Sequence, residues 1–210
     1  MKTETLIRLL AADNTQPVTP IGRSLAAAFT MGGSVSVLLF VLTMHPRADI
    51  TAALYTPRFV SKLLICLSLA GAAAILLIRA ARPLPSRRLS IIAIPLLLLI
   101  VAIVIELSVM PASTWLPRLI GRNARHCLSL IPLLSLAPAA SVLIALTRGA
   151  PLRPALAGAA AGLVAGGFGA VLYGLTCPDD SPLFVGTWYT LAIGAVATAS
   201  AWVGNRLLRW

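Results

Sequence analysis

The stretch PALAGAAAGLVAGGFGAVLYGL, residues 154–175, carries no charged side chain. About 20 consecutive apolar residues in a helix cross a hydrocarbon core about 30 Å thick, so this stretch predicts a transmembrane helix. Small residues recur in it at every fourth position: Gly158, Gly162, Gly166, Ala170 and Gly174. Because small residues let helix backbones approach closely in a membrane, we expect this helix to be central in a bundle or closely paired.

The rest of the chain has the same character. Five further apolar runs lie at about 24–44, 60–78, 89–109, 127–147 and 183–204. Of the 210 residues, 59% are hydrophobic and only 11% are charged, whereas about 25% are charged in soluble domains. The sequence therefore predicts an all-α membrane protein, a bundle of six transmembrane helices spanning residues 24–210, preceded by a head at residues 1–23.

The basic residues are distributed unevenly between the two sides of this bundle. With the N-terminus inside, the inner side holds eleven of the 17 Lys and Arg residues: Lys2, Arg8, Arg23, Arg79, Arg82, Arg87, Arg88, Arg148, Arg153, Arg206 and Arg209. The outer side holds six: Arg47, Arg58, Lys62, Arg118, Arg122 and Arg125. The positive-inside rule therefore places both termini in the cytoplasm. No basic run is interleaved with aromatic residues, so we expect the lipid bilayer, and no nucleic acid, as a direct partner.

The head contains a short amphipathic segment. Leu6, Leu9 and Leu10 fall on one helical face with Ile7 beside them, and Asn14 follows as a helix stop. A helix of about ten residues is not stable alone in water. We expect it to lie on the membrane surface, to dock on its own bundle or to occupy a groove in a partner.

Two of the three cysteines are expected at the outer face. Counted from Ala150, Cys127 and Cys177 reach similar heights, about 35 and 40 Å at about 1.5 Å per helical residue, whereas Cys66 falls inside the bilayer as a packing residue. In an oxidising compartment the pair could form a disulfide or act as a sensor. With His126, Asp179 and Asp180, it could instead ligate a thiophilic divalent metal as a transient signal, with no resident cofactor. The alternative is that Cys127 is a buried apolar residue while Asp179 and Asp180 cap the last helix.

No catalytic motif is present, so the sequence predicts no enzyme. The only acidic residue within the runs is Glu106, about one turn before Pro111, and we expect its carboxylate to reach the membrane interface. A small transporter or permease is the alternative function, for which Glu106 and proline-broken helices would matter. A membrane redox enzyme would need a second thiol pair or an intramembrane histidine, and the runs contain neither.

Four strings resemble one known family: KTETLIRLLAAD (2–13), PRFVSKL (57–63), RNARHCLSLIPLLSLAP (122–138) and, most specifically, the segment 148–194. They are similar to the NrsF family, negative regulators of a group IV (extracytoplasmic function) sigma factor. The resemblance covers nearly the whole chain. It implies six transmembrane helices in the bacterial inner membrane and an anti-sigma role, in which a sigma factor is held inactive until a periplasmic signal releases it.

The resemblance also implies functions for particular residues. Its paired outer cysteines, the implied sensor of oxidative or heavy-metal stress, correspond to Cys127 and Cys177. Our own candidate for the sigma-contacting helix is the amphipathic head, with Leu6, Ile7, Leu9, Leu10 and Asp13. We expect oxidation or metallation of the pair to change the spacing of the fourth and fifth helices, and the glycine-lined fifth helix to carry this change to the inner face.

Overall fold

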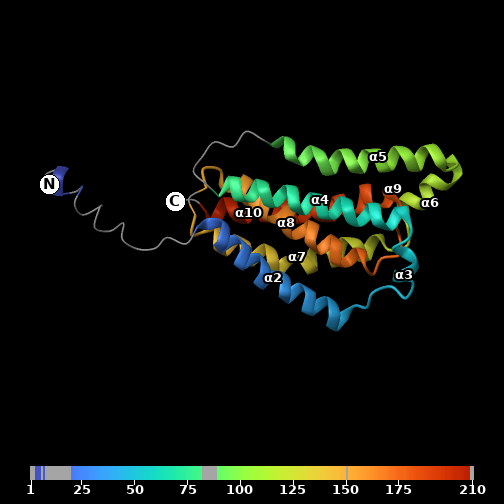
Figure 1. Cartoon of the computed structure of the whole chain (residues 1–210), viewed down its shortest axis with the longest axis horizontal. Coiled ribbons are helices and arrows are strands. Elements are labelled where there is room, and N and C mark those ends of the chain that lie inside the picture. The colour runs from blue at the N-terminus through green and yellow to red at the C-terminus, as the bar shows by residue number, and fades with distance from the viewer. Residues whose placement is uncertain (1–2, 6, 8–19, 82–88, 150, 209–210) are drawn as a thin grey trace.

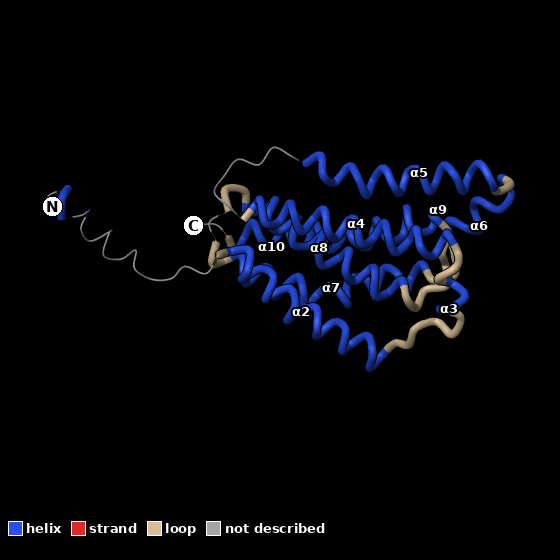
Figure 2. Tube along the Cα trace, in the orientation of Figure 1, coloured by secondary structure: helices blue, strands red, loops and turns tan. Residues whose placement is uncertain are grey.

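In the computed structural model the chain is a bundle of helices (Figure 1), described over residues 3–5, 7, 20–81, 89–149 and 151–208. Figure 2 shows that the described residues form helices joined by short loops, without strands. The regular elements are α2 (Ile21–Thr43), α3 (Ile50–Ala53), α4 (Pro57–Ala80), η1 (Leu89–Ile92), α5 (Ala93–Val109), η2 (Ala112–Thr114), α6 (Trp115–Ile120), α7 (Ala124–Leu146), α8 (Pro154–Gly174), α9 (Pro182–Phe184), η3 (Val185–Tyr189) and α10 (Thr190–Leu207).

Six of these helical stretches are long and apolar enough to cross a membrane, in agreement with the sequence. They are α2, α4, η1 with α5, α7, α8, and the continuous run of α9, η3 and α10. Each of the six apolar runs predicted from the sequence coincides with one of them. The π-helical turn η3 lies near the start of the last stretch, at the end of the bundle that holds the cysteines.

Helix α8 lies at the centre of the bundle, as its small residues predict. It packs on α10, α4 and α7, while α2 packs on α7 and α5 lies at the edge beside α4 (Figure 1). The start of α2 and the end of α10 lie at the same end of the bundle, here called the terminal end. The short helices α3, α6 and α9 lie at the opposite end, here called the loop end.

The glycines of α8 face three different helices. Gly158, Gly162 and Gly166 lie against α10, where a Cβ atom on Gly162 would stand 2.7 Å from the Cα of Ala197. Gly167 lies against Ala70 of α4, and Gly169 lies against α7. Gly174, the last position of the four-residue repeat, does not face α10 as Gly158, Gly162 and Gly166 do, but faces Leu63 and Lys62 of α4. In a membrane such close contact gives helices dispersion energy that the hydrophobic effect does not supply.

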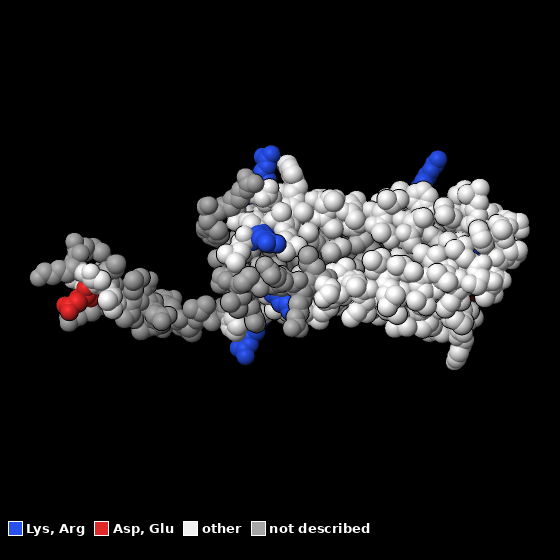
Figure 3. All heavy atoms as spheres, turned by 90° about the horizontal axis from the view of Figure 1, so that it is seen from above, with Lys and Arg blue, Asp and Glu red and all other residues white. Residues whose placement is uncertain are grey.

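The two ends of the bundle differ in how their charges are neutralised. Basic residues gather at the terminal end on the face drawn in Figure 3, with Arg79 in the last turn of α4 and Arg206 in the last turn of α10. At the loop end four carboxylates, those of Asp49, Glu106, Asp179 and Asp180, accept bonds from cationic or N–H groups. Positive charge is therefore concentrated at the terminal end.

Candidate functional site: the cysteines and the loop after α8

The loop between α8 and α9, residues 175–181, contains Cys177 and two acidic residues with separate partners. Asp179 accepts three hydrogen bonds on its Oδ2, from the backbone N–H of Arg122 (3.0 Å), the backbone N–H of Asn123 (2.9 Å) and the Asn123 side-chain amide (3.0 Å). Asn123 immediately precedes α7, which carries Cys127. The Asp179 carboxylate thus links the loop segment after Cys177 to the turn that precedes α7 and Cys127.

Gly121 makes that turn possible. It ends α6 with a φ of 60°, in the left-handed region that glycine adopts without steric cost. A Cβ atom here would collide with the ring of Phe184 and would lie 3.0 Å from Oδ2 of Asp179. The glycine therefore both turns the chain and leaves room for the carboxylate that the next two N–H groups bind.

Asp180 has different partners, on α4 and on the segment between α2 and α3. Its Oδ1 accepts a 2.5 Å hydrogen bond from Nζ of Lys62, and its Oδ2 accepts a 2.6 Å bond from Arg47. Lys62 has no exposed side-chain surface and also donates to the carbonyl of Cys177 at 2.9 Å. Its ammonium lies 5.2 Å from the ring centroid of Phe59. A charge this deeply buried is tolerated only when it is paired and hydrogen-bonded, so this network anchors the Cys177 loop on α4.

Arg47 extends the network to the surface. It binds both carboxylate oxygens of the exposed Asp49 at 2.7 Å. The hydrogen bonds that Arg47 donates to Asp49 and Asp180 raise the pKa of Arg47 above its ordinary value, against the opposing effect of burial. The bond from Arg47 in turn lowers the pKa of Asp49. Arg47 therefore stays charged throughout the physiological range.

The interpretation of Asp179 and Asp180 as helix caps is wrong, since Ser181 is the N-cap of α9. Its hydroxyl accepts a hydrogen bond from the N–H of Leu183 at 3.3 Å. Ser181 caps α9 without either carboxylate, because its backbone is already extended, as in an N-cap, and Pro182 follows it as the first helical residue. The two carboxylates are consequently available to the segments that converge on this loop from outside α9.

Glu106 lies in the last turn of α5, at the loop end. Its side chain is only 4% exposed and accepts hydrogen bonds from Nε of Arg58 (3.0 Å) and from Arg118 (2.8 Å), so its carboxylate is paired and buried. Ser181 donates to it more weakly at 3.4 Å. Two arginines that the sequence placed in separate loops cover this carboxylate. Glu106 is thus part of an ion cluster with Arg58 and Arg118.

The three cysteines are free thiols, and all are buried in one hydrophobic cluster at the loop end. Cys127 and Cys177 come together there from the ends of α7 and α8. Cys66 of α4, expected only as a packing residue deep in the bilayer, belongs to the same cluster, as do Tyr173 and Tyr189. The loop end therefore holds Cys127 and Cys177, with Cys66 in the same buried cluster.

Cys177 has the most polar surroundings of the pair. Burial raises the pKa of the Cys177 thiol, while the charge of Lys62, the backbone N–H of Asp179 and the hydroxyl of Tyr173 act in the opposite direction. The thiol is thus protonated at neutral pH, but three groups that stabilise a thiolate surround its sulfur. Of the two paired cysteines, Cys177 is the better placed to react as a nucleophile.

The predicted metal ligands are not gathered into one site. His126 is exposed, and Asp179 and Asp180 are bonded to the groups described above. Within the described residues, no group of three or more His, Cys, Asp and Glu side chains could hold a metal ion. Metal binding by Cys127 and Cys177 with these three residues would require a rearranged loop.

Most of the candidate sigma-contacting residues, Leu6, Leu9, Leu10 and Asp13, lie outside the described residues. Ile7 is described and is helical, with 59% of its surface exposed. The sequence reasoning missed Lys62, Arg47 and Tyr173. A lysine inside an apolar run was the available signal, because a charge at that depth needs a partner.

Comparison with known sequences identifies the relatives of this chain. A family model described as "Negative regulator of sigma F" matches residues 10–210. The chain belongs to the NrsF family. It is 37% identical over 218 residues to the "Anti-sigma-F factor NrsF" of Caulobacter vibrioides, and 33% identical over 217 residues to the "Probable anti-sigma-F factor NrsF" of Azospira oryzae. Both alignments cover 100% of each chain, and no solved structure matches. The resemblance to NrsF noted in the sequence is confirmed.

Proposed function

We propose that this protein is an inner-membrane anti-sigma factor that holds an extracytoplasmic-function sigma factor inactive and releases it when Cys127 and Cys177 react in the periplasm. Membership of the NrsF family supports the regulation of a sigma factor, and the six apolar helices support the membrane. The observation that carries the proposal is that two buried thiols, Cys127 and Cys177, belong to one cluster, and that the loop carrying Cys177 is tied to three other segments.

The proposed orientation places the terminal end in the cytoplasm. Of the 17 Lys and Arg residues, six belong to the segments of the loop end and eleven to the segments at the other side of the six helices. The positive-inside rule then assigns both termini and the head, residues 1–23, to the cytoplasm. The loop end lies in the periplasm, where thiols can be oxidised and disulfides persist.

The proposed chemistry starts at Cys177. Its thiolate attacks a hydroperoxide, the O–O bond breaks, and the products are a sulfenic acid on Cys177 and one water or alcohol. The Cys127 thiol then attacks that sulfur and displaces water, so the two thiols lose two electrons in all and form a disulfide. A thiophilic divalent metal would act on the same pair by displacing both thiol protons.

Reaction of the pair would act on the contacts that hold the loop. Drawing Cys177 toward Cys127 changes the position of its carbonyl, which accepts from Lys62, and of Asp179, which holds the start of α7. Helix α8 leads from this point through the centre of the bundle to the terminal end. The proposed sigma contact, formed by Leu6, Ile7, Leu9, Leu10 and Asp13, precedes α2 in the sequence, and α2 begins at that end. Signalling requires two arrangements that differ in their affinity for the sigma factor.

Affinity purification of the tagged protein from solubilised membranes, with mass spectrometry of bound proteins, tests the anti-sigma function. We expect a sigma factor in unstressed cells and its loss after peroxide or metal treatment. Joint replacement of Leu6, Leu9 and Leu10 by Asp should abolish recovery, while recovery unchanged by it would move the contact to the inner loops. Absence of any sigma factor from unstressed cells would refute the anti-sigma function.

The sensor is tested separately with serine variants of the cysteines. Cys127→Ser with Cys177→Ser should retain the sigma factor after stress, whereas the matched control Cys66→Ser, in the same buried cluster, should release it. A normal stress response in the double variant would refute the cysteine mechanism and leave the anti-sigma function standing.

A further inference from the structure

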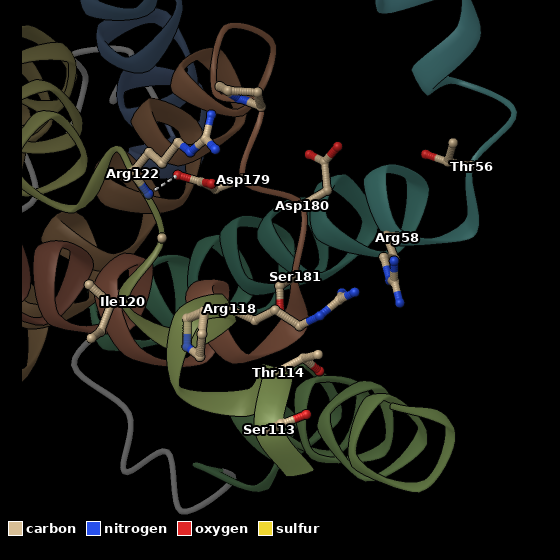
Figure 4. A pocket seen from close by; sticks show the side chains of 13 residues that line it. Thr56, Arg58, Ser113, Thr114, Arg118, Ile120, Arg122, Asp179, Asp180 and Ser181 are labelled. Carbon is tan, nitrogen blue, oxygen red and sulfur yellow. Dashed lines mark hydrogen bonds between the residues drawn. The ribbon is translucent and has the colours of Figure 1, made fainter. Parts of the chain in front are cut away.

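A cavity of about 830 Å³ opens at the loop end beside the loop that carries Cys177 (Figure 4). The start of α4, the η2–α6 segment with the turn after it, and residues 178–181 form its walls. Figure 4 shows the side chains of Arg58 and Arg118 reaching toward one another across this cavity, close to Ser181 and Thr114. Glu106 fixes both guanidinium groups from behind, because Arg58 bonds to its Oε2 and Arg118 to its Oε1.

The polar groups in this cavity that make no hydrogen bond to the described residues are mainly donors. Arg58 uses only Nε and Arg118 only one terminal nitrogen toward Glu106, so most of their N–H groups have no bond to the described residues. The guanidinium of Arg122 and the hydroxyl of Ser113 make none there. A guanidinium carries five N–H donors and no acceptor.

Most carboxylate oxygens around the cavity are already occupied. Both carboxylate oxygens of Asp180 and both of Glu106 accept bonds from cationic side chains. Asp179 concentrates three donors on Oδ2, which leaves only its Oδ1 as a free carboxylate oxygen.

The charges around the cavity do not cancel. Five cationic side chains, namely Arg47, Arg58, Lys62, Arg118 and Arg122, meet four carboxylates, those of Asp49, Glu106, Asp179 and Asp180. One positive charge therefore has no counter-charge within this cluster. Arg58 and Arg118 share the single carboxylate of Glu106, and the guanidinium of Arg122 bonds to no carboxylate of the described residues, so the unmatched charge lies among these three arginines.

We infer that this cavity binds an oxyanion of the phosphate class. A phosphate group supplies several acceptor oxygens and negative charge, which matches guanidinium forks whose N–H groups are unused. Glu106 preorganises two of the forks, and Arg122 and Ser113 close the donor set. The phosphate belongs either to an ion in solution or to the headgroup of an anionic lipid, because the cavity opens at the loop end, where the apolar helix α4 begins. This inference does not depend on the anti-sigma function.

Binding to the full-length protein in lipid nanodiscs tests the inference. Inorganic phosphate is titrated calorimetrically into protein held in phosphatidylcholine. The thermal midpoint is then compared between phosphatidylcholine and mixed phosphatidylcholine–phosphatidylglycerol discs. If the source is a free anion, phosphate binds in phosphatidylcholine. If the source is a lipid, phosphatidylglycerol raises the midpoint and added phosphate has no further effect.

Arginine variants decide whether the binding occurs in this cavity. We expect Arg122→Gln to weaken binding at least fivefold, and its fold should be preserved because its side chain is exposed and its backbone N–H still serves Asp179. Arg118→Gln should weaken binding at least tenfold. The matched control is Arg125→Gln, an exposed arginine of the neighbouring α7 outside the cavity, which should bind as the wild type does. Absence of binding in both lipid conditions, or an equal loss in the Arg122 and Arg125 variants, would overturn the inference.

Discussion

Replacing Asp180 with asparagine removes the carboxylate that neutralises Lys62. The amide has almost the same shape and can still accept one hydrogen bond, so the change isolates the charge. Lys62 has no exposed side-chain surface and Asp180 is only 15% exposed. The variant would therefore leave a buried ammonium without a counter-ion, while Arg47 would retain Asp49.

The expected cost follows from this burial. Removing one partner of a buried ion pair destabilises a protein by about 3–5 kcal/mol, because the remaining charge is left uncompensated. For a chain of this size, about 2–4 °C of thermal midpoint corresponds to 1 kcal/mol, so Asp180→Asn should lower the midpoint by about 6–20 °C.

A double-mutant cycle in detergent measures this coupling. Lys62→Met removes the ammonium and keeps an unbranched apolar side chain, so it should be less harmful than Asp180→Asn. The double variant should recover much of the loss, because it buries no charge without a partner. Asp49→Asn is the control, since Asp49 pairs with the same Arg47 but its side chain is 59% exposed and screened by water.

Two results would refute the reasoning. One is an Asp180→Asn midpoint that stays within about 2 °C of the wild type, which corresponds to no more than about 1 kcal/mol. The other is strict additivity of the Lys62 and Asp180 changes, which would mean that the two side chains do not stabilise each other.

Three further predictions concern the cysteine cluster and the centre of the bundle. Because the pKa of Cys177 lies above its ordinary value, alkylation of this thiol should remain slow through pH 9 and accelerate only as pH rises further; a half-maximal rate near pH 8 would contradict this. Gly162→Ala should destabilise the protein by about 1–3 kcal/mol through overpacking against α10. The control Gly194→Ala should not, because the space around its Cβ position is open. Equal thermal midpoints of these two variants would refute the close contact at Gly162. Tyr189→Phe should leave the thermal midpoint unchanged or raise it, because the Tyr189 hydroxyl is buried without a partner among the described residues. Tyr173→Phe should lower the midpoint, since the Tyr173 hydroxyl donates to the carbonyl of Asn123. A lower midpoint for the Tyr189 variant than for the Tyr173 variant would show that the Tyr189 hydroxyl is bonded.

The helices were predictable from the sequence because the length of each is a local property. A membrane-spanning helix needs one uninterrupted apolar run, so the runs and the helices coincide without any knowledge of their neighbours. The central place of α8 was predictable for a related reason, since glycines at every fourth position leave a helix able to approach others closely.

The partners of the acidic residues were not predictable in the same way. Asp179 reaches Asn123 and Asp180 reaches Lys62 across more than 50 intervening residues, so each contact depends on how separate segments meet at the loop end. The same holds for Glu106, whose arginines come from α4 and α6. The sequence did mark Lys62 and Glu106 as charges inside apolar runs, and the need to compensate such charges was the clue to the cluster.

The close approach of α8 to its neighbours limits how this protein can change in evolution. Glycine is already the smallest residue, so Gly158 and Gly169 can be replaced only by something larger. The nearest atoms include the main-chain carbonyl oxygens of Ser200 and Ile131, which are present whatever residues occupy those positions. A smaller side chain on the facing helix cannot remove these obstacles. A substitution at either glycine can therefore be accommodated only if whole helices move apart, which places these two sites among the least free to vary in the chain.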